Sequence, residues 1–177
     1  ASTSDTNSFV LYFENGSVLP FFWIPRETAR SKAEMANYLE WERAGHMTLT
    51  DGQIIDQQII VRDVIEICSQ YDVKSIAFDK FLAYHGVIQG LMDLDLPLIE
   101  HRQGFISMST PTKHLETLVK REEIRHGGNP VLRWMCKNVE LSMDASENIK
   151  IDKKKSSEKV DGMVALVMGV SASMTIE

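Results

Sequence analysis

The stretch from Val160 to Val170 constrains the fold more than any other part of the chain. Apart from Asp161, its residues are all apolar or small, and at helical spacing the apolar ones cover every side rather than a single stripe. A helix with this pattern is buried all round. A chain of 177 residues is long enough to build a core around such a helix.

The rest of the sequence predicts short strands that alternate with helices. Asn15 and Gly16 lie between two apolar runs, which indicates a hairpin with a type I′ turn. Helical spacing of apolar residues, Ile65 among them, predicts a longer helix further along the chain. Helix, strand, helix, strand is the order typical of a sheet covered by helices. We expect strands over 9–13, 18–23, 47–50, 73–78 and 96–99, helices over 29–44, 56–71, 84–92, 110–125 and 129–138, and a second hairpin around 144–147.

Two helix starts are predicted from local signals. Thr110 and Pro111 are expected to open the helix over 110–125, because proline is favoured in the first turn. Ser156 is expected to cap the last helix, with Glu158 in its first turn, where a negative charge is favourable.

Composition excludes several classes of protein. The net charge of −6 argues against nonspecific binding along a nucleic-acid backbone, which needs a basic surface. Cys68 and Cys136 form no metal or disulfide pattern and are expected to be reduced, buried thiols of an intracellular protein. The N-terminus lacks the features of a secretory signal, and no apolar run approaches the ~20 residues of a membrane span. The five histidines show no zinc-site spacing, and neither a P-loop nor a GxSxG motif is present.

Two acids are the candidates for chemistry. Asp161 opens the buried helix, where it could simply complement the helix dipole. Asp79 follows an apolar strand, at the position where α/β sheets collect ligands, but it could equally be a turn residue. Together they could hold one divalent ion, because Mg²⁺ is usually bound by one or two carboxylates and substrate phosphate. Five lysines between positions 150 and 159 form either a solvated turn or a contact for phosphates: Lys150, Lys153, Lys154, Lys155 and Lys159.

Four segments then indicate a family. They are Leu19-Pro-Phe-Phe-Trp-Ile-Pro25, Ile76-Ala-Phe-Asp-Lys80, His126-Gly-Gly-Asn-Pro-Val-Leu-Arg-Trp134 and Lys159-Val-Asp-Gly-Met-Val-Ala-Leu166, in this order. The set resembles the C-terminal nuclease domain of the large terminase subunit of tailed bacteriophages, over essentially the whole chain.

The resemblance implies a single nuclease domain over 1–177 with a ribonuclease H-like α/β fold, in which helices cover both faces of a central mixed β-sheet. It implies an endonuclease that uses Mg²⁺ or Mn²⁺, two ions in all, to cut concatemeric double-stranded viral DNA. Asp79 and Asp161 match two of the family's metal-binding acids, and Lys153, Lys154, Lys155 and Lys159 would contact DNA. It further implies a portal protein and a small terminase subunit as partners, an ATPase domain ahead of this one, and action in the bacterial cytoplasm.

One departure from the family concerns its first acid, which lies on the first strand. We expect that strand, with its acid, to precede Ala1, so this chain by itself is expected to bind metal weakly and cut poorly. Asp5 matches a later acid of the adjoining turn and is a further candidate ligand. Two alternatives stay open: another ribonuclease H-like nuclease, such as a junction resolvase, and a non-catalytic module of a packaging machine.

Overall fold

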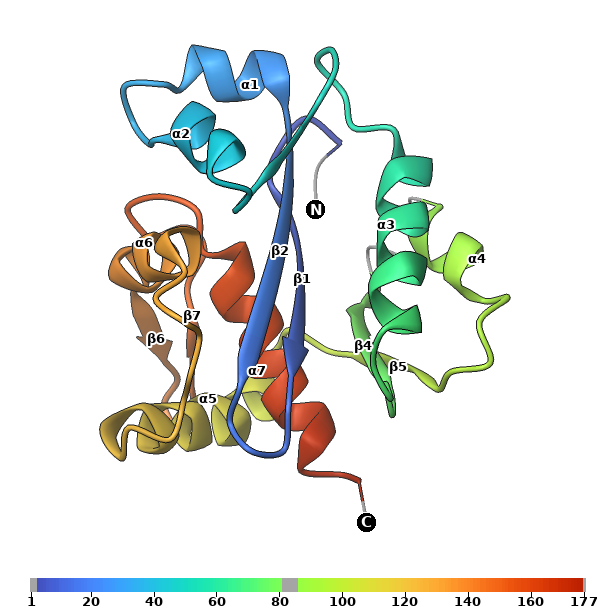
Figure 1. Cartoon of the computed structure of the whole chain (residues 1–177). Coiled ribbons are helices and arrows are strands. Elements are labelled where there is room, and N and C mark those ends of the chain that lie inside the picture. The colour runs from blue at the N-terminus through green and yellow to red at the C-terminus, as the bar shows by residue number, and fades with distance from the viewer. Residues whose placement is uncertain (1–2, 81–85, 177) are drawn as a thin grey trace. The chain divides into compact units, whose positions relative to one another are not determined.

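A computed structural model describes residues 3–80 and 86–176 (Figure 1). Its elements are β1 (Asn7–Tyr12), β2 (Val18–Pro25), α1 (Arg26–Ser31), α2 (Tyr38–Arg43), β3 (Thr48–Thr50), α3 (Gln57–Ser69), β4 (Ile76–Asp79), α4 (Val87–Leu91), β5 (Leu98–His101), α5 (Phe105–Lys120), α6 (Pro130–Asn138), β6 (Leu141–Met143), β7 (Ile149–Ile151) and α7 (Asp161–Ser173). Strands and helices are interspersed along the chain, so the predicted α/β class is confirmed. Residues 84 and 85, where a helix was expected to begin, lie outside the described residues.

The described strands form three sheets rather than the single central sheet that was expected. Their orders are β1-β2-β3, β4-β5 and β6-β7. The first is mixed, because β1 and β2 form a hairpin while β2 and β3 are parallel, with Ile24 opposite Leu49. No helix within residues 3–80 and 86–176 is long and apolar enough to cross a membrane.

The chain divides into two compact units. The first contains Ala1–Ser8 and Phe21–Glu100, and the second contains Phe9–Pro20 and His101–Glu177. Both strands of the first hairpin therefore pass from one unit into the other.

In the first unit, α3 packs against α4. Gly90 permits this contact, because a Cβ built there would lie 2.8 Å from a methyl carbon of Val61. The predicted helix over 56–71 is confirmed as α3, and the side chain of Asp56 caps it by accepting a hydrogen bond from the backbone of Gln58. The inward placement expected for Ile65 is wrong, since it is 39% exposed.

The single helix expected over 29–44 is wrong, because α1 and α2 are separate. Lys32, which ends α1, and Asn37, which precedes α2, both have non-helical backbone angles. The break allows Tyr38 and Trp41 to be buried, with their rings packed edge to face. The polar pattern of this segment concealed those two anchors.

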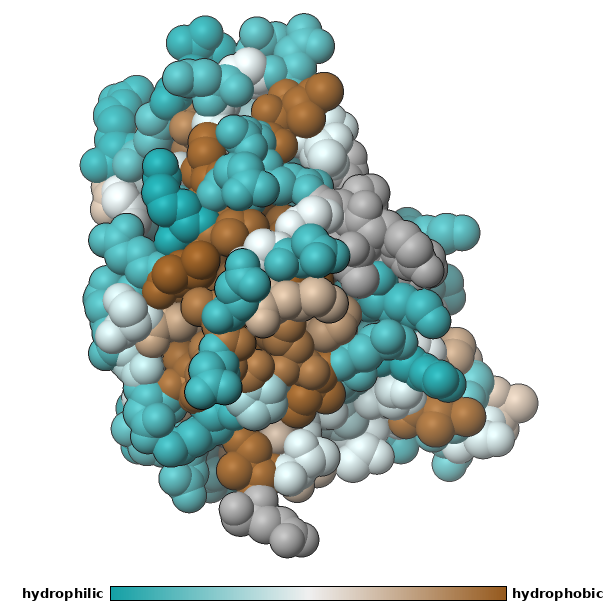
Figure 2. Space-filling model, turned by 90° about the vertical axis from the view of Figure 1, so that its right-hand side faces the viewer, coloured by the Kyte–Doolittle hydropathy of each residue, from teal (hydrophilic) through white to brown (hydrophobic). Residues whose placement is uncertain are grey.

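In the second unit, α7 packs against both α5 and α6, and β7 covers another part of α5 (Figure 1). Leu166, Val167 and Val170 are completely or almost completely buried, so the prediction of a largely buried helix is confirmed. It is not buried all round, because Ala165 and Gly169 are half-buried. Apolar side chains are also exposed in this unit, above all Ile106 and Met143. The face of the molecule in Figure 2 shows apolar surface interspersed with hydrophilic groups.

The first hairpin has a different turn from the one expected. Within the turn at 13–17, which the structure describes throughout, Gly16 alone has a positive φ, whereas a type I′ turn needs two such residues. The Gly16 N–H instead donates to the Phe13 carbonyl, and the Asn15 side chain accepts from the Ser17 N–H. This is the pattern of a longer loop with a glycine bulge, in which the asparagine stabilises the turn through its side chain.

Arg125 holds the tip of this hairpin. Its N–H donates to the Gly16 carbonyl, its carbonyl accepts from the Val18 N–H, and its guanidinium donates to the Asn15 carbonyl, at 2.8–2.9 Å. The neighbouring carbonyl oxygen of Glu123 would lie 1.9 Å from a Cβ at Gly16. Glycine is therefore required at this position by space as well as by backbone angle.

Helix α5 begins earlier than expected. It starts at Phe105, so Pro111 lies inside the helix instead of in its first turn. An internal proline removes one backbone hydrogen bond. The Thr112 hydroxyl bonds the carbonyl of Met108 one turn earlier.

The end of α5 is also not where the sequence indicated. The helix stops at Lys120 rather than near Gly127, because Glu122 has a φ of 58°. The Glu123 N–H donates to the Leu118 carbonyl and the Glu122 N–H to the Val119 carbonyl, which is a Schellman motif. Glycine is the usual residue at the left-handed position of this motif.

We therefore expect Glu122→Gly to raise the free energy of unfolding by about 1 kcal/mol, since it removes the left-handed strain of a residue with a Cβ. Urea unfolding of the two proteins measures the difference. Glu123→Gly, one residue on, is the matched control and should not stabilise the protein. Equal effects of the two changes would contradict the assignment of strain to Glu122.

The two cysteines differ in environment. Cys68 lies on the buried face of α3, and burial raises the pKa of its thiol. Cys136 is exposed on α6, so the expectation of two buried thiols is wrong for this residue. Its neighbours Met135 and Lys137 take the inward and outward positions respectively, and the helix turns Cys136 toward solvent.

Candidate active site

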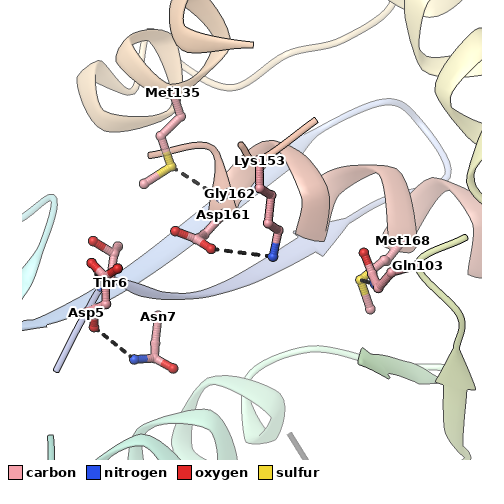
Figure 3. A network of polar contacts seen from close by, with 9 residues as sticks. All are labelled: Asp5, Thr6, Asn7, Gln103, Met135, Lys153, Asp161, Gly162 and Met168. Carbon is pink, nitrogen blue, oxygen red and sulfur yellow. Dashed lines mark hydrogen bonds and ion pairs between the residues drawn. The ribbon is translucent and has the colours of Figure 1, made fainter. Parts of the chain in front are cut away.

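Asp161 is the first residue of α7, as the apolar pattern of that helix implied. Its side chain is 24% exposed, and its Oδ1 lies 3.8 Å from the Nζ of Lys153 (Figure 3). Gly162, Met163 and Val164, which follow Asp161 directly, are buried, so its backbone is held by the core while its carboxylate reaches the surface. A carboxylate here is favoured by the positive end of the helix dipole, whatever else it binds.

Ser156 does not cap α7, contrary to the prediction. The helix begins five residues later, and the residue at its N-cap position, Val160, has no side-chain acceptor. The Ser156 hydroxyl instead donates to the Asp152 carbonyl at 2.6 Å and accepts from the Glu140 N–H at 3.2 Å. The hydroxyl is thus engaged by groups that do not belong to α7.

Residues 152–155 form a tight turn that we call the lysine turn. Oδ1 of Asp152 accepts the backbone N–H groups of Lys154 and Lys155 at 2.9 and 3.1 Å, and its Oδ2 accepts from the Ser142 hydroxyl. The side chains of Lys153, Lys154 and Lys155 are exposed. Asp152 therefore sets the backbone from which three ammonium groups project.

These bonds lower the pKa of Asp152 below its ordinary value of 3.8, first through the Ser142 hydroxyl and then through the Lys155 N–H. A carboxylate with a lowered pKa stabilises the fold above its unfolded pKa, and the contribution disappears as pH falls through the folded pKa. We expect the parent to be more stable than Asp152→Asn at pH 7 and the difference to shrink below about pH 4. Urea unfolding across this pH range is the measurement, and a difference that persists undiminished at pH 2 would contradict the stabilising role of the ionised carboxylate.

The other two lysines of the predicted group are placed differently. Lys150 lies on β7 with its ammonium 4.9 Å from the centre of the Phe105 ring, a cation–π contact. Lys159 is half-buried in the approach to α7, and its carbonyl accepts from the Asn138 side chain. The lysine turn thus carries the most accessible positive charge of this segment.

Asp79 is the last residue of β4, as expected, and is half-buried in the first unit. The next residue, Lys80, lies 3.9 Å from a carboxylate oxygen of Glu100 near the end of the partner strand β5. Asp5 lies in the same unit, where its Oδ1 accepts from the Thr6 N–H and its carbonyl from the Asn7 side chain (Figure 3). Asp5 thus stabilises the entry into β1.

The carboxylates fit the chemistry of a hard divalent cation, since Mg²⁺ takes oxygen ligands and often only one or two from the protein. Within residues 3–80 and 86–176, no group of three or more His, Cys, Asp or Glu side chains could hold a metal ion by itself. Asp79 and Asp5 belong to the first unit and Asp161 to the second. A shared ion between them is therefore a proposal, taken up below.

Sequence reasoning missed three residues of this region. Asp152 was passed over, although an aspartate ahead of three lysines is a recognisable turn signal. Met135 on α6 contacts the start of α7, and Asn138 contacts the segment just before it; neither left a signal, because their partners are 19 or more residues away. Figure 3 shows the Met135 contact beside Asp161.

The model of one family, "Terminase large subunit, endonuclease domain", matches residues 4–177. The chain belongs to this family.

Curated relatives agree with the family match. The large terminase subunit of Enterobacteria phage HK97 is 38% identical over 159 residues, which cover 88% of this chain and 32% of that protein. Protein YmfN of Escherichia coli K12 is 30% identical over 169 residues, 91% of this chain and 37% of the relative. The chain thus spans about a third of the length of these relatives.

Two solved structures are similar. The crystal structure of the HK97 large terminase matches with a TM-score of 0.86 at 35% identity, over 96% of this chain and 37% of the other. The large terminase nuclease of thermophilic phage G20c matches with a TM-score of 0.63 at 10% identity, over 97% of this chain and 77% of the other. At that low identity the second match concerns the fold alone.

Proposed function

We propose that the chain is the metal-dependent endonuclease domain of a viral DNA-packaging terminase, with a ribonuclease H-like fold. The observation that carries this proposal is the family match over residues 4–177. The position of Asp161, on the surface end of a rigid buried helix, supports it.

In this proposal Asp79 and Asp161 hold the divalent cations through their carboxylate oxygens, with Asp5 a weaker candidate. Two such ions, when bound, would activate water and stabilise the leaving oxygen of the phosphodiester. The protein's own contribution is to hold the carboxylates in place and to bring DNA to them. Lys153 has a further role in this proposal. Its ammonium lies 3.8 Å from the Asp161 carboxylate and would move from it to a DNA phosphate when DNA binds.

The lysine turn and Lys159 would contact the phosphates of double-stranded DNA. Contacts of this kind bind without regard to sequence and weaken as salt rises. They reconcile the acidic net charge of −6 with a DNA substrate, since the positive charge is local. The proposed substrate is concatemeric viral DNA in the host cytoplasm, with a portal protein, a small terminase subunit and an ATPase domain ahead of this one as partners.

Cleavage of supercoiled plasmid with Mn²⁺ tests the activity. The assay uses the full-length protein that the gene encodes. The expected result is nicking and linearisation that EDTA prevents. Absence of both cleavage and calorimetric Mn²⁺ binding would overturn the proposal and favour a non-catalytic module.

A comparison of substrates distinguishes the terminase proposal from the remaining alternative, a nuclease of the junction-resolvase type. Linear duplexes, four-way junctions and RNA–DNA hybrids of equal length are compared at equal concentration. The terminase proposal predicts no preference for the junction. A strong preference for it would favour a nuclease of the junction-resolvase type.

A further inference from the structure

The start of α7 lacks the usual side-chain cap. The first N–H groups of any helix have no partner within the helix, and a Ser, Thr, Asn or Asp at the N-cap normally accepts one of them. Val160 occupies that position and cannot. The Gly162 N–H donates instead to the thioether sulfur of Met135 on α6, at 3.2 Å (Figure 3). Met135 is 0% exposed, so the contact is made inside the core.

A second residue of α6 binds the segment just before α7. The side-chain amide of Asn138 donates to the Lys159 carbonyl at 3.0 Å, and its oxygen accepts from the Ser157 hydroxyl at 3.3 Å. Asn138 is only 8% exposed. Met135 and Asn138 are three residues apart and therefore lie on one face of α6, and α6 packs against α7.

We propose that Met135 and Asn138 are positioning residues that fix the carboxylate of Asp161 by binding backbone groups on both sides of it. Lys159 precedes Asp161 by two residues and Gly162 follows it directly, and both are held by the same helix. Displacements of about 1 Å at a reacting group are enough to slow catalysis. The effect of these residues on cleavage rests on the proposed function, whereas their two contacts are observed independently of it.

Methionine supplies both volume and an acceptor at this point. Leucine has nearly the same volume and is normally tolerated in its place, but it has no sulfur to accept a hydrogen bond. Met135→Leu therefore removes the contact to Gly162 and little else. Met108 on α5 provides the matched control, because it is 2% exposed and its sulfur makes no hydrogen bond among those found for the described residues.

Amide hydrogen exchange, followed by NMR in the 177-residue chain, tests the contact directly. In Met135→Leu the Gly162 amide should exchange roughly two- to tenfold faster, the loss expected for one hydrogen bond. The amides of Val167 and Val170 in the same helix report global unfolding and serve as the internal reference. Met108→Leu should leave the Gly162 rate unchanged relative to that reference. Equal Gly162 rates in the two variants would overturn the proposal.

Mn²⁺ binding provides a second test of the positioning role. Paramagnetic Mn²⁺ should broaden the Asp161 and Gly162 signals of the parent, and Met135→Leu or Asn138→Ala should require more Mn²⁺ for the same broadening. Absence of broadening in the parent would count against the proposed function alone. Broadening in the parent that neither variant alters would overturn the positioning role alone.

Discussion

Asp161→Asn is expected to lower Mn²⁺-dependent plasmid cleavage by the full-length protein at least about 100-fold, since substitution of residues that merely support a metal ligand already costs 10- to 100-fold. The substitution keeps the shape of the side chain and removes its charge. If Asp161 served only the helix dipole, its loss would cost about 0.3–1 kcal/mol of stability and leave cleavage intact. The rate of plasmid conversion, measured beside urea unfolding, separates these two roles.

Glu158→Gln is the matched control. It removes the same charge three residues earlier, from a half-buried side chain that the proposal places outside the metal site. Its cleavage rate should stay close to that of the parent. Asp79→Asn should behave like Asp161→Asn, because both carboxylates are proposed to hold the metal. Parent-like cutting by both aspartate variants would remove the basis for the site.

Gly16→Ala is expected to have the largest effect on stability, a loss of about 3 kcal/mol or more in the free energy of unfolding. One part is the left-handed backbone, with a φ of 83°. The other part is steric, because the new Cβ would meet the Glu123 carbonyl oxygen at 1.9 Å and force the hairpin tip away from its anchor. Urea unfolding of the parent and the variant measures the sum.

Gly45→Ala measures the backbone part alone. Gly45 has a φ of 80° and nothing within 4 Å of the position that a Cβ would take, so only the backbone strain of about 1–2 kcal/mol should appear. The difference between the two variants is then the cost of separating the hairpin tip from residues 123–125. Equal losses in both would mean that the anchor contributes little.

The correct predictions concern elements that are marked by residues close together in the sequence. The apolar character of Val160–Val170 led to a largely buried helix, and the helix expected over 129–138 is confirmed as α6, where the Asn129 side chain accepts a hydrogen bond from the Leu132 N–H. The acid at the head of α7 was also placed from sequence alone. In each case the sequence signal, an apolar pattern or a capping side chain, lies within a few residues.

The predictions that were wrong concern residues whose deciding contacts the local sequence does not reveal. Ser156 has the chemistry of a cap, but Glu140 and the Asp152 carbonyl occupy its hydroxyl, and Glu140 is 16 residues away. The break between α1 and α2 follows from the burial of Tyr38 and Trp41, which a polar local pattern conceals. Nothing in the sequence indicates the hydrogen bond of Met135, because a methionine on the inner face of a helix is normally an ordinary core residue. Competing tertiary contacts of this kind override local propensity.

The strands of the first hairpin, which pass from one compact unit into the other, have a consequence for dissecting the protein. No single cut in the backbone separates the two units intact. A C-terminal fragment starting at His101 would lack Tyr12, against whose side chain Gly169 of α7 lies, and the hairpin tip that Arg125 binds. An N-terminal fragment ending at Glu100 would carry that hairpin without its anchor. Because the two units are interleaved along the chain, we expect that neither fragment folds autonomously.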